Sequence, residues 1–104
     1  MPAIEKFIQQ NYTDPNLGAA SLSEEFRIST FYLSRIFKAD MGMGVLDYIH
    51  RVRIDAAREL LISTDLTLDD VAQKTGFSNR WGFMRVFKQL EGTTPGAFRL
   101  HAEN

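Results

Sequence analysis

The sequence predicts an all-α fold with seven helices. No stretch shows the strict alternation of apolar and polar residues that is typical of a half-buried strand. Apolar residues recur instead at spacings of three and four, as they do along one face of a helix. Gly, Pro, Ser and Thr residues stand between these periodic stretches, and such residues terminate or cap helices.

The N-terminal part of the chain is expected to form three helices, over about residues 2–11, 19–26 and 30–41. Ser29 can accept hydrogen bonds from the free amides in the first turn of the third helix. Gly42 then closes that helix, because glycine readily adopts the left-handed conformation of a helix end.

A long helix is predicted over residues 45–63. At a rise of 1.5 Å per residue it would be about 28 Å long, which suits a spacer. Its apolar stripe is predicted to consist of Val45, Ile49, Val52, Ala56 and Leu60.

Three shorter helices complete the prediction. Thr67 caps a helix that ends near Lys74. A glycine-containing turn leads into a helix over about residues 79–90. The last helix covers about residues 95–101, with Thr94 as its cap and proline at its first position.

Length and composition predict one small domain with a single core. A chain of 104 residues buries one modest core but not two independent ones. Because it has no cysteine and its histidines, His50 and His101, lie far apart, no disulfide, metal or cofactor site is expected. Both histidines are expected to be ordinary surface residues. No apolar run approaches the roughly 18 to 20 residues of a membrane span, and no signal peptide is apparent, which predicts a cytoplasmic protein.

The basic residues are concentrated in two segments. A net charge of −1 and a pI of about 6.1 argue weakly against a nucleic-acid binder, whose affinity depends largely on phosphate contacts. However, residues 27–38 contain three basic side chains and residues 74–88 contain four, and neither segment contains an acidic one.

One segment of the chain is duplicated. Arg35-Ile36-Phe37-Lys38 recurs fifty positions later as Arg85-Val86-Phe87-Lys88, and Gly42 is matched by Gly92. The short helix before each copy also matches, but at an offset of forty-nine, so one residue has been gained after the turn.

Each copy consists of a short helix, a turn and a longer helix, which is the layout of a helix-turn-helix. The two units are predicted over about residues 18–42 and 67–91, and the helix over residues 45–63 joins them. Together with the last helix they would form a single domain over residues 1–104. In such a unit the second helix packs one face on the first and offers the other to the major groove of DNA.

The helical spacing separates these two faces. The buried faces are predicted to contain Leu33, Ile36 and Phe37 in the first unit and Phe83, Val86 and Phe87 in the second, with Phe77 also in the core. The outward faces are predicted to contain Thr30, Phe31, Ser34, Arg35 and Lys38, and then Arg80, Trp81, Met84, Arg85 and Lys88.

The outward faces combine arginine with exposed apolar groups. Exposure of Phe31, Trp81 and Met84 is unfavourable unless a partner covers them. DNA is such a partner, because Arg can hydrogen-bond guanine and apolar groups can contact the thymine methyl. The faces differ in content, so two dissimilar DNA segments about one turn, roughly 34 Å, apart are expected.

From about Leu17 to Arg99 the chain resembles the DNA-binding domain of the AraC/XylS family of bacterial transcription regulators. Each motif is weak by itself, but together they are specific: residues 29–38, 53–61, 76–77, 85–88 and 94–99. Three residues depart from the family pattern. Trp81 stands where the family has a small polar residue, Gly82 replaces a bulky residue, and Gly18 replaces a hydroxyl cap.

The resemblance implies a seven-helix domain that inserts its third and sixth helices into successive major-groove segments and activates transcription through RNA polymerase. The candidate base-reading residues are then Thr30, Phe31, Ser34, Arg35, Asn79, Arg80, Trp81, Met84 and Arg85, and the candidate phosphate contacts are Lys38 and Lys88. A sensing or dimerisation domain is expected in the same full-length chain. The sequence would then be either a C-terminal piece, which we favour, or a stand-alone regulator.

Other interpretations stay open at this point. Arg35 and Arg85 would form surface ion pairs of little energetic value if they did not contact DNA, and Lys38 and Lys88 would be solvated helix ends. Trp81 would cover neighbouring side chains or contact a subunit. A helical protein-interaction module is the alternative function. An enzyme is not expected, because no nucleophile with a histidine partner and no phosphate loop is found.

Overall fold

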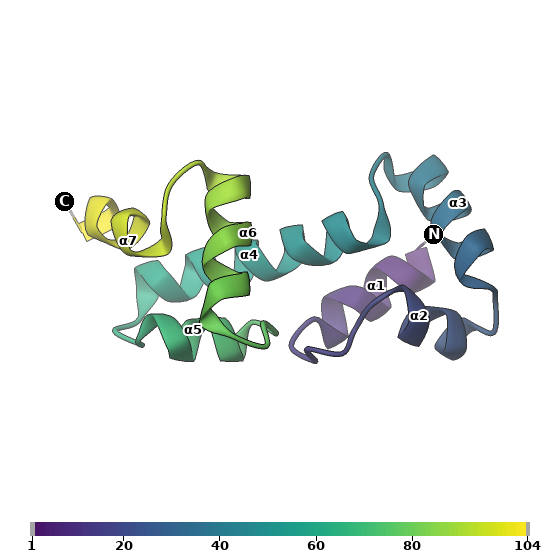
Figure 1. Ribbon diagram of the computed structural model, residues 1–104, viewed down its shortest axis with the longest axis horizontal. Helices are drawn as coiled ribbons and strands as arrows, with labels where there is room; N and C mark the ends of the chain where they lie inside the picture. Colours follow the sequence, from purple (N-terminus) through teal and green to yellow (C-terminus); the bar gives the residue numbers. More distant parts are fainter. Residues whose placement is uncertain (1, 104) are drawn as a thin grey trace. The chain divides into compact units, whose positions relative to one another are not determined.

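The computed structural model describes residues 2–103 and has an all-α fold (Figure 1). Within that range there are seven helices and no strand: α1 (Pro2–Asn11), α2 (Ala19–Phe26), α3 (Thr30–Met41), α4 (Val45–Ser63), α5 (Leu68–Lys74), α6 (Arg80–Glu91) and α7 (Pro95–Glu103). The predicted fold class is confirmed. Two helices differ slightly in extent, since α6 starts after Asn79 and α7 continues beyond residue 101. No helix in the described range is long and apolar enough to cross a membrane.

Local caps define the helix ends, as predicted. The side chains of Ser29, Thr67 and Thr94 each accept a hydrogen bond from the amide three residues later, over 3.0, 3.1 and 3.2 Å respectively. The helices α3 and α6 both end at a glycine in the left-handed conformation, Gly42 with φ of 77° and Gly92 with φ of 78°. The same stop signal therefore ends both copies of the repeat.

The chain divides into two compact units, one ending at Val52 and the other starting at Arg53. We call them unit 1 and unit 2. Each has its own cluster of buried residues, so the expectation of a single core was wrong. The physical reason is that each helix-turn-helix packs on its own part of α4 and closes an apolar cluster there.

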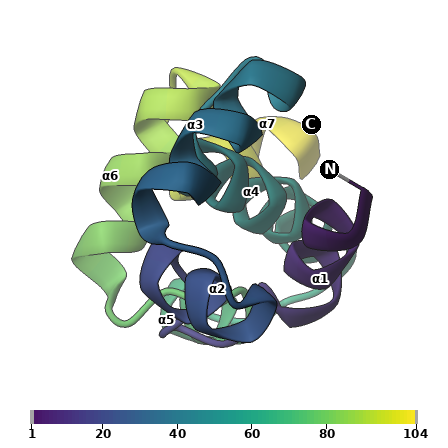
Figure 2. The ribbon, with the colours of Figure 1, turned by 90° about the vertical axis from the view of Figure 1, so that its right-hand side faces the viewer.

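The core of unit 1 lies between α1, α2, α3 and the start of α4 (Figure 2). Two edge-on aromatic pairs contribute to it, Phe7 with Phe26 and Phe37 with Tyr48, each with 5.6 Å between ring centroids. The buried residues are Ile4, Ile8, Leu17, Leu22, Leu33, Phe37, Val45 and Ile49.

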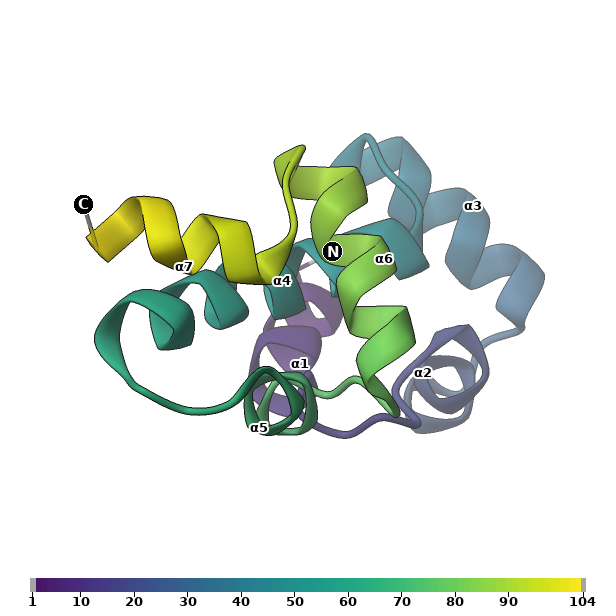
Figure 3. The ribbon, with the colours of Figure 1, turned by 60° about the vertical axis from the view of Figure 1, so that its left-hand side comes forward.

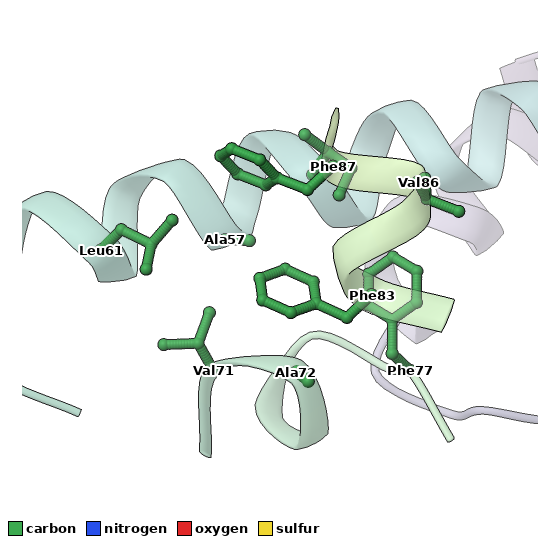
Figure 4. Packing of buried hydrophobic residues seen from close by; sticks show 9 residues of the cluster. Ala57, Leu61, Val71, Ala72, Phe77, Phe83, Val86 and Phe87 are labelled. Atoms are coloured by element: carbon green, nitrogen blue, oxygen red, sulfur yellow. The ribbon is translucent and has the colours of Figure 1, made fainter. Parts of the chain in front are cut away.

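The core of unit 2 is built around a chain of phenylalanines (Figure 4). Phe83 lies 5.4 Å from Phe77 and 5.8 Å from Phe87, and Phe87 lies 5.5 Å from Phe98, measured between ring centroids. The side chains of Val71 and Ala72 come from α5, and those of Ile54, Ala57 and Leu61 come from α4.

The predicted stripe along α4 is only partly correct. Val45 and Ile49 are buried in unit 1, but Val52, Ala56 and Leu60 are only half-buried. In unit 2 the buried positions of α4 are Ile54, Ala57 and Leu61. The helix α4 takes part in two cores, and each core buries its own positions along it, so the buried residues do not follow a single stripe.

In unit 2, α7 lies beside the end of α4 and the segment that follows it (Figure 3), and Arg99 joins them by hydrogen bonds. Its guanidinium donates hydrogen bonds to the carbonyl oxygens of Leu61, Leu66 and Thr64 at 3.1, 2.6 and 3.2 Å. These carbonyls lie at or just beyond the C-terminal turn of α4, where the helix leaves acceptors unpaired. A cation at this place is also favoured by the helix dipole.

Candidate nucleic-acid interface

The turns between the paired helices have related backbone conformations. In unit 1, Arg27 follows α2 with a φ of 56°, and in unit 2 Gly76 stands forty-nine positions later with a φ of 97°. The second turn is one residue longer, since α3 is capped by Ser29 and α6 by Asn79, fifty positions later. The extra residue therefore lies within the turn between the helices, between Gly76 and the cap of α6, rather than after the turn.

The outward face of α3 is exposed, as predicted. Phe31 is 76% exposed, and Thr30, Ser34, Arg35 and Lys38 are exposed as well. Together with Ala39, four of these side chains line a hollow of about 420 Å³. Arg35 forms no ion pair with any described residue, so the alternative of a surface ion pair does not apply to it.

The opposite face of α3 holds the helix in unit 1. Leu33 and Phe37 are fully buried, while Ile36 is half-buried beside α1 and α2 in a second, apolar hollow. The predicted separation of the two faces is therefore confirmed, with Ile36 at their border.

The outward face of α6 follows the same plan with one difference. Trp81 is 76% exposed, and Arg85 and Lys88 are exposed. Arg85 has no ion-pair partner among the described residues. Met84, however, is half-buried and packs in part against the unit 2 core. It is less available to a partner than the sequence pattern suggested.

Arg80 differs from the other candidate arginines because it has a partner. Its Nε and Nη2 atoms donate to Oδ1 and Oδ2 of Asp69 at 2.7 and 2.9 Å. The hydrogen bond from Arg80 lowers the pKa of the Asp69 carboxyl, and the same bond raises the pKa of the guanidinium. Both side chains remain exposed.

This pair was missed by sequence reasoning, although the repeat contains a signal for it. The positions equivalent to Asp69 and Arg80 in unit 1 are Ala20 and Thr30. Because Asp69 and Arg80 are both present in unit 2 and both absent from unit 1, the comparison of the two copies suggests that they form a pair.

The remaining candidate, Asn79, has a structural task. Its Oδ1 accepts a hydrogen bond from the amide of Gly82 at 2.9 Å, which caps α6. A role for its side-chain amino group in base contacts stays a prediction. Near Gly82 there is room for a Cβ atom, since the nearest neighbour would be Asn79 Oδ1 at 3.7 Å.

The start of α2 compensates for its missing hydroxyl cap. Gly18 stands at the cap position in an extended conformation. Its amide donates to Ser21 Oγ at 3.0 Å, so the side chain three residues into the helix satisfies the cap residue instead. The departure at Gly18 therefore leaves the helix intact.

His50 is half-buried rather than a simple surface residue, while His101 is exposed as expected. Neither lies on an outward face of α3 or α6. The candidate interface thus consists of one exposed face on each of two helices, and each face combines an unpaired arginine, a lysine and a large aromatic side chain.

Comparison with known proteins agrees with this arrangement. Residues 22–101 match the helix-turn-helix domain family. The chain is 34% identical over 92% of its length to the bifunctional transcriptional activator/DNA repair enzyme AdaA of Bacillus subtilis, of which it covers 45%. It is 32% identical over 94% of its length to the arabinose operon regulatory protein of Escherichia coli, of which it covers 34%.

Among solved structures, the C-terminal domain of the two-component response regulator yesN from Fusobacterium nucleatum has the same fold. The TM-score is 0.92 at 33% sequence identity, and the match covers 94% of this chain and 95% of that one. The chain spans less than half the length of the two curated relatives named above. The match to the helix-turn-helix family over residues 22–101 and the two helix-turn-helix units together show that the chain belongs to the AraC/XylS family, as a DNA-binding domain of that family.

Proposed function

We propose that this chain acts as one DNA-binding domain that recognises an asymmetric double-stranded site by inserting α3 and α6 into successive segments of the major groove. The observation that carries the proposal is the pair of exposed faces on these helices. Each presents an arginine without an ion-pair partner next to an aromatic side chain that is 76% exposed. An Arg can bond both acceptors of guanine, and an apolar group can contact the thymine methyl.

Differences between the faces support an asymmetric site. The face of α3 offers Thr30, Phe31, Ser34 and Arg35, whereas that of α6 offers Arg80, Trp81 and Arg85. Unlike side chains select unlike bases, so the two halves of the site need not be related by symmetry. Lys38 and Lys88 would contact phosphates, which fixes the position of the protein on DNA without specifying sequence.

The wider role is regulation of transcription. We propose activation through RNA polymerase, with a sensing or dimerisation domain elsewhere in the full-length protein. Support comes from the named relatives, one of which is a transcriptional activator and the other an operon regulator, and from the small share of their length that this domain covers. The DNA repair activity in the name of the first relative is not proposed for this domain.

Selection of duplexes from a randomised pool tests the proposal. We expect a non-palindromic site whose halves lie about one helical turn apart. The selected duplex and a scrambled one are then titrated at two salt concentrations. Failure to enrich any sequence, with weak binding that vanishes in salt, would contradict the proposal and favour a protein-docking module.

Two single substitutions separate the reading helices. We expect Arg35→Ala to relax base preference in one half of the selected site and Arg85→Ala in the other half, each with a loss of about 1–3 kcal/mol of discrimination. Repeated selection with each variant measures this. Lys6→Ala is the matched control, since it removes an exposed positive charge on α1 and should leave base preference unchanged. Equal losses on every sequence would show that the arginines contact only phosphates.

A further inference from the structure

Asp69 and Arg80 form a two-point contact between the first turns of α5 and α6 in unit 2. The carboxylate binds the side of the guanidinium, through Nε and Nη2, at 2.7 and 2.9 Å. Such a planar contact fixes the orientation of the arginine head as well as its position. A flexible side chain is thereby held in one direction before any ligand binds.

The contact leaves the outer edge of the guanidinium available. A guanidinium has five N–H donors, and Asp69 takes the one on Nε and one on Nη2. One donor of Nη1 and the other donor of Nη2 form a second edge, whose two N–H bonds run parallel to each other, and no described residue bonds to it. Two parallel donors match the O6 and N7 acceptors of guanine in the major groove.

The place of Arg80 in the helix agrees with such a contact. It is the first residue of α6, and the N-terminal residues of a recognition helix are those that contact base edges. Its side chain is 47% exposed and that of Asp69 is 61% exposed. An unpaired carboxylate at this place would repel phosphates, whereas the pair with Arg80 neutralises it.

We propose, on the basis of the proposed function, that Asp69 is a positioning residue that holds Arg80 so that its outer guanidinium edge reads one guanine. Unit 1 has Ala20 and Thr30 at the equivalent positions and has no such device. Asp69 would therefore determine specificity only in the half of the site that α6 reads. Because the pair already orders the Arg80 side chain in the free protein, that side chain loses less conformational entropy when DNA binds.

The first step of the test identifies the base pair concerned. Duplex selection is carried out with the wild-type chain, Arg80→Ala and Arg80→Lys. We expect both variants to lose the preference for guanine at the same single position, because lysine keeps the charge but lacks the planar pair of donors. If neither variant changes any base preference, the proposal is overturned.

The second step tests Asp69 itself. The ratio of Kd values for adenine and guanine at that position is measured for Asp69→Asn, with Asp70→Asn as the matched control that removes the same charge one residue away. Asp69→Asn is expected to lower the ratio about tenfold, whereas Asp70→Asn leaves it unchanged. In the Arg80→Ala background, Asp69→Asn should have no further effect on the ratio.

The outcomes are distinguishable from one another. Since the pair is exposed, its loss has little effect on stability, and circular dichroism of the variants verifies the fold. An unchanged ratio in Asp69→Asn overturns the positioning role. An increased ratio also overturns it, and shows that Asp69 competes with DNA for Arg80. In both cases sequence-specific binding by the wild-type chain would still stand. A wild-type chain that selects no sequence overturns the proposed function and this inference together.

Discussion

Arg27 is the one residue other than glycine that has a positive φ within the described range. The left-handed conformation costs an ordinary L-residue about 1–2 kcal/mol relative to the right-handed one. Arg27 accepts it because its amide donates to the carbonyl of Glu24 and closes α2. The repeat shows the less strained solution, since Gly76 stands at the equivalent place in unit 2.

Replacing Arg27 by glycine should therefore stabilise the domain. The relief of backbone strain is partly offset by the greater freedom of glycine in the unfolded chain, so we expect a gain of about 0.5–1 kcal/mol in the free energy of unfolding. Urea denaturation measures it. The converse change, Gly76→Ala, should lower stability by at least about 1 kcal/mol. A loss of stability in Arg27→Gly would show that the arginine side chain itself stabilises the turn.

At the scale of elements, hydrogen bonds from one side chain contribute to the attachment of α7 in unit 2. Arg99 donates to three backbone carbonyls near the end of α4. Arg58 of α4 adds a contact to α7, since its guanidinium carbon lies 5.9 Å from the centre of the Phe98 ring. Its Nε also lies 3.1 Å from Oε1 of Glu91, at the end of α6. The last helix is thus held by polar contacts as well as by Phe98.

Truncation of Arg99 should cost more than a typical surface change. We expect Arg99→Ala to lower the free energy of unfolding by about 2 kcal/mol, because half-buried carbonyls lose a charged donor. Arg99→Lys should recover little of this, since an ammonium group cannot replace the planar fork. Thermal and urea unfolding measure both. As a control, Lys88→Ala removes an exposed cation from α6 and should change stability by less than about 0.5 kcal/mol.

At the scale of the whole molecule, the described residues form two separate buried clusters that share no residue. Phe37 and Phe87 occupy equivalent positions of the repeat and are both fully buried, each in a different unit. The duplication of sequence is therefore also a duplication of cores. Local stability can differ between such units even though they belong to one chain.

Core substitutions at the two equivalent positions should reveal this division. Phe37→Ala and Phe87→Ala are each expected to cost about 3–5 kcal/mol. Hydrogen exchange should accelerate first in residues 2–52 for Phe37→Ala and in residues 53–103 for Phe87→Ala, because each substitution opens a different cluster. Uniform acceleration over the whole chain in both variants would show instead that the two clusters unfold as one cooperative unit.

The sequence by itself determined the helices, their caps and the two faces of α3 and α6. These features depend on residues within one or two turns of each other, such as Ser29 and the amide three residues later, or Leu33 and Phe37 on one side of a helix. Such short-range interactions leave a periodic pattern that can be read without a structure. The AraC-type resemblance added the expectations of activation through RNA polymerase and of a sensing or dimerisation domain in the full-length chain.

Only the tertiary structure decided the features that join distant residues. The two cores, the contact of Asp69 with Arg80 across eleven positions, and the bonds of Arg99 to carbonyls 33 to 38 positions away are of this kind. Their partners are set by the packing of whole helices, which the periodicity of the chain does not record, although comparison of the two copies of the repeat singles out Asp69 and Arg80. The half-burial of Met84 has the same cause, since it depends on how α6 packs in unit 2.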